Sequence, residues 1–260
     1  MFLDPRKSLC LVIAFLLCIA TSPIQQGNRA NAKAIPVIAQ SAVTMHPLQP
    51  LITAFYATKA AVTGYEVHTF REENNTWQKV PILQHAIRHR FIALHAILQT
   101  LTTKASSKRQ DVLGTGYREE QVGKERVRET VTVQIASFWQ GKQAMTLQVE
   151  RIVAKRNDLA GFRTAYTALA QSARSKGIET ALIEGMLPTS MPKVKQQALI
   201  VRALHAVHAV PGKMISDAYT SSALGTFGMT TATLQIATHR DTRQDRTKVL
   251  VGCPLITVEY

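Results

Sequence analysis

The chain has little cysteine and few aromatic residues. Cysteine occurs three times in 260 residues, and Phe, Trp and Tyr together make up 6%. Cys10 and Cys18 lie in an apolar run near the start, which leaves Cys253 alone in the remainder. A lone cysteine cannot form an intramolecular disulfide. Because Cys253 stands in an apolar stretch, we predict a buried, unreactive thiol.

The sequence also lacks a long apolar run. The longest near the start, residues 9–20, has 12 residues and follows two basic side chains, as in an export signal. A helix that crosses a membrane needs about 20 apolar residues, so this run is too short for a permanent anchor. Cleavage sites compete at residues 20–22 and 30–32, and we favour the second. We therefore expect residues 1–32 to be a signal peptide that is removed. The mature protein should be periplasmic or secreted, with no stable transmembrane segment.

Acidic residues are scarce relative to basic ones. Residues 33–260 contain 28 Lys and Arg against 16 Asp and Glu, and the whole chain has a formal net charge of +14. Such a balance attracts acidic partners or polyanions through its electric field. The basic side chains are densest in residues 104–128, and the candidates for binding a partner or a polyanion are Lys108, Arg109, Arg118, Lys124, Arg126 and Arg128.

The hydrophobic pattern predicts an α+β fold. Apolar residues recur at helical spacing in three central segments, residues 81–103, 158–176 and 193–210. A shorter helix is expected at residues 179–186, and another at residues 51–62.

Strand-like alternation surrounds these helices. It predicts a β-hairpin from residues 65–70 and 76–80, a second from 131–135 and 145–149, and strands at 233–238 and 249–260. The second hairpin has a helical alternative, and residues 118–128 are expected as a helical lead-in to it.

Two polar stretches predict loops, and no internal repeat is found. Residues 104–116 include Gly114 and Gly116, whose spacing does not fit a phosphate-binding loop and indicates a turn. Residues 220–231 are rich in Ser, Thr and Gly. We divide the chain into residues 1–32, an N-terminal helix and hairpin region at 33–110, and an α+β region at 111–260. The last two parts are also compatible with a single domain.

Two pairs of histidines are the candidates for a metal site. His85 and His89 stand four apart on one predicted helix, a spacing that places both imidazoles on one face. His205 and His208 form a second close pair, and four histidines could meet if the two helices packed face to face. The zinc-protease motif is absent because Ala86 stands where its Glu is required. Packed or hydrogen-bonded histidines are the favoured interpretation, and we expect no cofactor.

No motif in the sequence names a reaction. Ser190 to Lys193 matches the Ser-x-x-Lys pattern of penicillin-binding enzymes, but Pro192 interrupts it and the accompanying motifs do not follow. Our hypothesis is an exported, non-catalytic structural or binding protein of the bacterial envelope, an accessory of a secretion, conjugation or pilus assembly with other envelope proteins as partners. The alternatives are an exported enzyme with a dispersed or metal-dependent site and a polyanion-binding protein.

Overall fold

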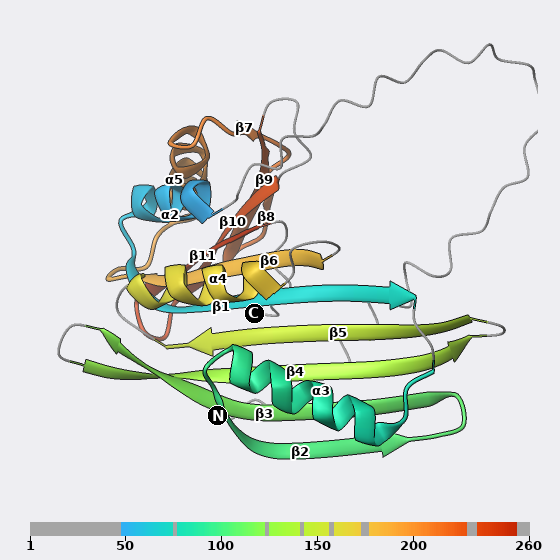
Figure 1. The fold of residues 1–260 in the computed structure, drawn as a ribbon. Coiled ribbons are helices and arrows are strands. Elements are labelled where there is room, and N and C mark those ends of the chain that lie inside the picture. The colour runs from blue at the N-terminus through green and yellow to red at the C-terminus, as the bar shows by residue number, and fades with distance from the viewer. Residues whose placement is uncertain are drawn as a thin grey trace, which may run out of the picture. The chain divides into compact units, whose positions relative to one another are not determined.

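The computed structural model describes residues 48–74, 77–122, 125–140, 143–155, 159–172, 177–227 and 233–253. Within these ranges, four helices lie against one antiparallel sheet of eleven strands (Figure 1). The α+β class predicted from the sequence is confirmed. The predicted signal peptide lies outside the described residues.

The first half of the described chain builds one side of the sheet. Helix α2 (Leu48–Thr58) leads into strand β1 (Ala61–Asn74), and helix α3 (Val80–Ala93) follows. Four strands then run back and forth: β2 (Ile97–Ala105), β3 (Arg109–Val122), β4 (Glu125–Gln140) and β5 (Gln143–Ala154). Their order in the sheet is β2-β3-β4-β5-β1, so β2 forms an edge.

The second half repeats this plan with shorter strands. Helix α4 (Ala160–Ser172) leads into β6 (Gly177–Leu187), and helix α5 (Lys193–His205) follows. The remaining strands are β7 (Val210–Pro211), β8 (Ile215–Ser216), β9 (Thr220–Thr226), β10 (Thr233–Asp241) and β11 (Arg246–Cys253). They continue the sheet in the order β6-β11-β10-β9-β7, and β8 also pairs with β9.

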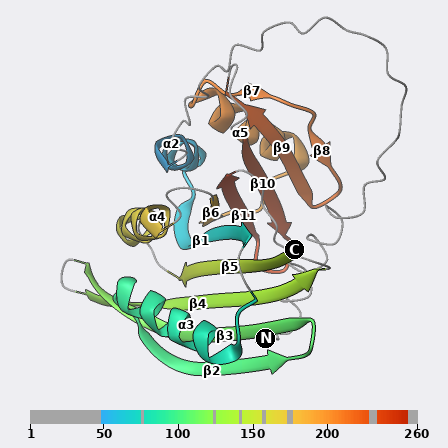
Figure 2. The same ribbon diagram turned by 45° about the vertical axis from the view of Figure 1, so that its right-hand side comes forward.

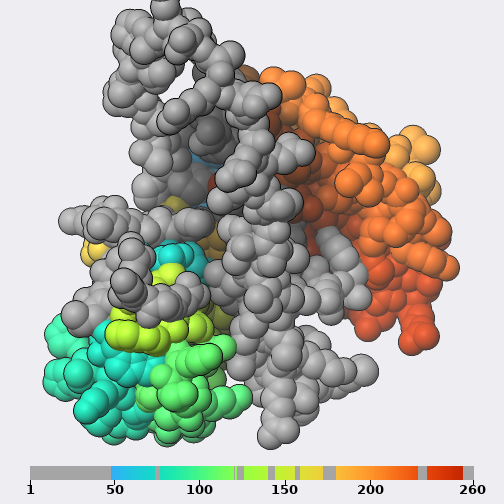
Figure 3. Space-filling view, turned by 90° about the vertical axis from the view of Figure 1, so that its right-hand side faces the viewer, coloured from blue at the N-terminus to red at the C-terminus, as the bar shows by residue number. Residues whose placement is uncertain are grey.

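The two halves therefore share a topology that no sequence repeat reveals. In each half the last strand of the meander returns to pair with the first strand, β5 with β1 and β11 with β6. β1 and β6 pair antiparallel and join the halves. Helix α2 packs on α5 and β11 of the second half, whereas α4 packs on β1 of the first (Figure 2). The green first-half and orange to red second-half segments gather in separate regions of the surface (Figure 3).

Helix α3 covers the sheet where β3 carries two glycines. Leu83, Ile87 and Phe91, one helical stripe, are at most 1% exposed. A Cβ on Gly114 would lie 2.6 Å from the Ile87 side chain, so a larger residue there would push the helix away. The predicted turn at these glycines is wrong, because they lie in β3, where the lack of a side chain lets α3 pack close to the strand.

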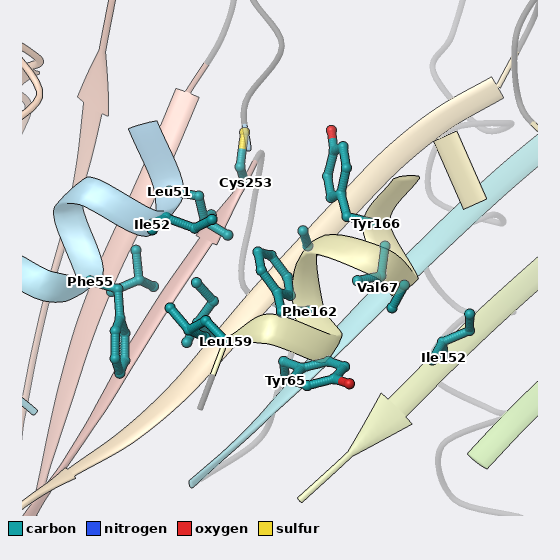
Figure 4. Packing of buried hydrophobic residues seen from close by; sticks show 14 of the residues in the cluster. Leu51, Ile52, Phe55, Tyr65, Val67, Ile152, Leu159, Phe162, Tyr166 and Cys253 are labelled. Carbon is teal, nitrogen blue, oxygen red and sulfur yellow. The ribbon is translucent and has the colours of Figure 1, made fainter. Parts of the chain in front are cut away.

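Helix α4 closes the core over β1. Phe162 faces Tyr65 edge-on with ring centroids 5.7 Å apart, an arrangement that aromatic pairs prefer (Figure 4). Both side chains are at most 1% exposed. Cys253 is buried as predicted, and burial raises the pKa of its thiol to about 11.

Several predicted elements are present, with different ends. The hairpin predicted from residues 131–135 and 145–149 is formed by β4 and β5, which pair antiparallel. The strand predicted at residues 233–238 lies in β10. The helices predicted at residues 158–176 and 193–210 are α4 and α5, and the latter ends at His205.

Other predicted elements are wrong. Helix α3 ends at Ala93 and not at residue 103, because the chain turns back to form β2. Residues 179–186 lie in β6 and not in a helix, because two neighbouring strands bond to this segment.

The first predicted hairpin and two predicted loops are also wrong. Residues 65–70 pair with β5 and β6 and not with residues 76–80, of which 77–79 are not in a strand. The loop expected at residues 104–116 contains the end of β2 and the first part of β3, and the loop expected at residues 220–231 contains β9. The helical lead-in expected at residues 118–128 lies instead in β3 and β4, apart from residues 123–124, which are outside the described part of the chain.

Candidate partner-binding surface

The four candidate metal ligands lie on two separate helices. His85 and His89 are exposed on α3, which covers β2, β3 and β4, whereas His205 ends α5, which covers β9 and β10. His208 follows α5 with a positive φ of 56° and is exposed. The two helices lie over different halves of the sheet (Figure 1). Across the residues that the structure describes, no group of three or more His, Cys, Asp or Glu is placed to hold a metal ion.

The candidate basic residues lie at different places along β3 and β4. Lys108 and Arg109 are at the turn between β2 and β3, where Arg109 lies opposite Phe138 of β4. Arg126 and Arg128 are exposed near the other end of β4, roughly 40 Å from Phe138 along the strand. These two groups therefore cannot form one compact patch.

Two of these basic residues contact aromatic rings, and one lies outside the described residues. The Arg109 guanidinium stands 4.9 Å from the centre of the Phe138 ring, and that of Arg128 stands 3.7 Å from the centre of the Tyr117 ring. Such contacts fix the orientation of a cation that remains accessible. Lys124 lies outside the part of the chain that the structure describes.

Arg118 is buried and has a structural partner. Its Nε donates to Glu129, a carboxylate with no exposed surface, and the Tyr65 hydroxyl donates to the other oxygen of Glu129. These three residues come from β3, β4 and β1 and face the helices. Because Arg118 is 7% exposed, it ties the sheet to its core and is not accessible on the surface.

A second buried carboxylate fixes the end of α3. Arg90 of the helix donates to Glu150 of β5, which is 1% exposed, and Gln148 lies beside it and accepts from Arg71 at 2.9 Å. An ion pair between a helix and a sheet sets how far the helix is rotated about its axis, since the paired side chain can reach its partner from one direction only. Arg90 thus orients the rest of α3.

The face of the sheet opposite the described helices carries a third group of charges. Glu66 of β1 contacts His68 of the same strand and accepts from Arg151 of β5 at 2.5 Å. Burial by itself would raise the pKa of Glu66, but the hydrogen bonds and positive charges of His68 and Arg151 outweigh it and hold the pKa at about 2. This group consists of paired charges that tie β1 to β5.

The outer side of α3 is exposed and combines two isoleucines with one arginine and two histidines. Ile82 and Ile92 are 55% and 72% exposed, and they lie near the two ends of the helix. His85, Arg88 and His89 stand between them and are exposed as well. We call these five residues the α3 stripe. An exposed apolar side chain is unremarkable alone, but two that frame an arginine and two histidines form a surface suited to a partner.

The α3 stripe lies in a part of the chain that contains no acidic residue. Residues 74–110 have six Lys or Arg, three His and no Asp or Glu. The next acidic residue, Asp111, accepts from Arg109 at 2.7 Å and from Gln134 at 3.0 Å. The segment therefore contains no carboxylate to neutralise the α3 stripe.

Comparison with known proteins does not identify a function for this surface. No protein-family model matches the chain, and no curated protein matches it. Among solved structures, the chain is similar to the crystal structure of DynU16, a protein of the dynemicin biosynthetic locus, at 10% sequence identity and a TM-score of 0.20. The match covers 72% of this chain and 86% of that chain. A TM-score of 0.20 is too low to support any inference about function.

Among the residues that the structure describes, no helix has the length and apolar character needed to cross a membrane.

Two residues of the α3 stripe are candidate site residues in the sequence, but for a different role. His85 and His89 were predicted as metal ligands, whereas Ile82, Arg88 and Ile92 were not singled out. The absence of acidic residues from 74–110 is readable from the sequence alone and could have identified this segment. That the two isoleucines are exposed could not have been inferred, because the helical pattern does not show where the buried face ends.

Proposed function

We propose that the chain is an exported, non-catalytic binding protein of the bacterial envelope that holds an acidic protein partner on the α3 stripe. The observation that carries the proposal is the exposed combination of Arg88, two histidines and two isoleucines in a segment without acidic residues. The export part depends on the signal-like residues 1–32. We further propose that the protein is an accessory of a secretion, conjugation or pilus assembly.

A binding role is supported by how the buried charges are used. The buried carboxylates Glu129 and Glu150 each have an arginine partner on another strand or layer, whereas Asp111 pairs with Arg109 of its own strand. Such pairs stabilise a folded framework and leave the exposed side chains of α3 for recognition.

The isoleucines of the α3 stripe favour a protein partner over a simple polyanion. A polyanion such as nucleic acid would be bound mainly through cations, with affinity that falls steeply as salt rises. A protein segment with both acidic and apolar side chains would use Arg88 and Ile92 together. Removal of the apolar side chain separates the two cases, since it leaves the charge unchanged.

The binding test uses the purified mature chain and a synthetic peptide of alternating Glu and Val. We expect binding that weakens with salt and that is about tenfold weaker for Ile92→Ser, which corresponds to roughly 1.4 kcal/mol. Val194→Ser is the matched control, because Val194 is 76% exposed on α5. If the parent chain does not bind the peptide, or if Ile92→Ser binds it as tightly as the parent chain does, the proposed binding role is refuted.

The export part has a separate test. The native host is fractionated, and the N-terminus of the protein is determined by mass spectrometry. We expect a chain that begins after residue 32 and is recovered with the envelope. A full-length chain with Met1, dissolved in the cell interior, would overturn the export part.

A further inference from the structure

The free edge of β2 offers a second means of holding an acidic segment. β2 is the last strand of the sheet on its side and pairs with β3 alone among the described strands. Consecutive residues of an antiparallel strand direct their backbone N–H and C=O groups to opposite sides, so about half of those of β2 point away from β3. Such groups are a template for another strand.

The two edges of the sheet differ in how they are protected. At the far edge, β9 is covered by the short strands β7 and β8, and β7 contains Pro211, which has no N–H to offer. β2 has nine residues, no proline and one charged residue, Lys104. A bulge between Leu98 and Thr100 disturbs its start, which leaves Thr100 to Ala105 as the regular edge.

The side chains beside this edge are positive on both faces of the sheet. Arg90 reaches Glu150 on the β5 side of α3, and Arg88, about 200° around the helix from it, points away from β5. Lys104 lies on the face of the sheet opposite the described helices, where its register partner Asp111 is already held by Arg109. The side chains of an added strand alternate between the two faces, so acidic residues on either face would meet a cation.

We infer that an extended acidic segment of the partner adds to the sheet as a strand antiparallel or parallel to β2, at Thr100 to Ala105. The inference rests on the proposed function, since it names how the acidic partner is held. A second copy of this chain is a poorer occupant, because pairing of two β2 edges would bring two Lys104 and two Arg88 side chains together with no acidic residue in either segment.

The test uses residue-level amide exchange of the mature chain with the Glu and Val peptide. We expect alternate amides of Thr100 to Ala105 to exchange at least tenfold more slowly when the peptide is bound. The control is the same peptide with alternate backbone nitrogens methylated, which keeps its charge and loses its ability to pair. Equal binding of both peptides, with no slowing in β2, would overturn the strand addition and leave the proposed function standing.

A pair of proline variants provides the second measurement. Thr102 and Thr103 are adjacent and direct their N–H groups to opposite sides, so one of Thr102→Pro and Thr103→Pro removes an outward donor and the other an inward one. The variant that removes the outward donor should keep its melting temperature and bind the peptide at least tenfold more weakly. The variant that removes the inward donor should have a lower melting temperature. Thr102→Ala and Thr103→Ala, which keep the N–H, should bind normally.

The remaining outcomes are also decisive. If the outward proline variant binds the peptide as well as the parent, strand addition is wrong. A peptide that fails to bind the parent chain refutes the proposed function and the inference together. A dimer that forms through slowed β2 amides without peptide would mean that a second copy occupies the edge.

Discussion

Removal of Arg118 should destabilise the protein far more than removal of an exposed arginine. Glu129 has no exposed surface and Arg118 is 7% exposed, so Arg118→Met leaves a buried carboxylate without its cation. Breaking one side of a buried ion pair costs about 3–5 kcal/mol. Domains of this size are stable by about 5–15 kcal/mol, so the loss is a large part of the whole.

The double variant separates the pair from its surroundings. Replacing both members by apolar residues of similar volume removes the uncompensated charge, so Arg118→Met with Glu129→Leu should cost only about 1–2 kcal/mol, from the hydrogen bond that Tyr65 loses. Urea unfolding at pH 7, followed by circular dichroism, measures the parent chain, the single variants Arg118→Met and Glu129→Leu, and the double variant. If Arg118→Met alone costs under 1 kcal/mol, Arg118 is not holding Glu129, and its assignment as a structural residue is wrong.

Three further predictions follow from other parts of the fold. The pKa of Glu66 is about 2 when folded and near 4.5 when unfolded, so the stability it contributes is complete above pH 4.5 and is lost as the pH falls towards 2. The free energy of unfolding of Glu66→Gln should therefore fall less steeply with pH between 4.5 and 2 than that of the parent chain. Gly116→Ala would place a Cβ 1.9 Å from the Ile97 carbonyl oxygen and should lower the free energy of unfolding by about 3 kcal/mol or more in urea. Cys253, whose pKa burial raises to about 11, should react with thiol reagents only after urea unfolds the chain, and fast labelling of the native protein would contradict its burial.

The β4 and β5 hairpin could be predicted because its local pattern agrees with its surroundings. Val131, Val133 and Ile135 alternate with polar residues, and β-branched side chains favour strands. One face of these strands is covered by helices, so alternation in the sequence corresponds to alternation in burial.

The helical pattern beyond Ala93 was misleading for a geometrical reason. The bulge in β2 lets Leu98 and Leu101, three residues apart, both face α3, where they lie opposite Gly116 and Gly114. Three-residue spacing is typical of a helix, whereas a regular strand would give spacing of two. The sequence alone does not show where a bulge will occur.

Small residues were taken for loops where helices approach strands closely. Gly225 of β9 has the Leu204 side chain of α5 2.5 Å from where its Cβ would be, just as Gly114 lies under α3. A segment rich in Gly, Ser and Thr suits both a loop and a strand beneath a helix. Only the packing of the two layers distinguishes them.

The candidate surface could be predicted only in part. The lack of acidic residues in 74–110 is a property of the sequence, and the direction of Arg88 away from β5 depends on the pairing of Arg90 with Glu150. That pair joins residues 60 positions apart, and no local pattern reveals it. The edge position of β2 likewise depends on the order of strands in the sheet.

The most direct test of the central claim is a charge reversal on α3 with a matched reversal on α5. The affinity of the mature chain for the Glu and Val peptide is measured for Arg88→Glu and for Arg202→Glu, since both arginines are exposed on helices and both changes alter the net charge equally. We predict a loss of at least tenfold for Arg88→Glu and a change of less than twofold for Arg202→Glu, because only the first lies in the α3 stripe. Equal losses would mean that net charge alone attracts the peptide and that α3 is not the binding surface.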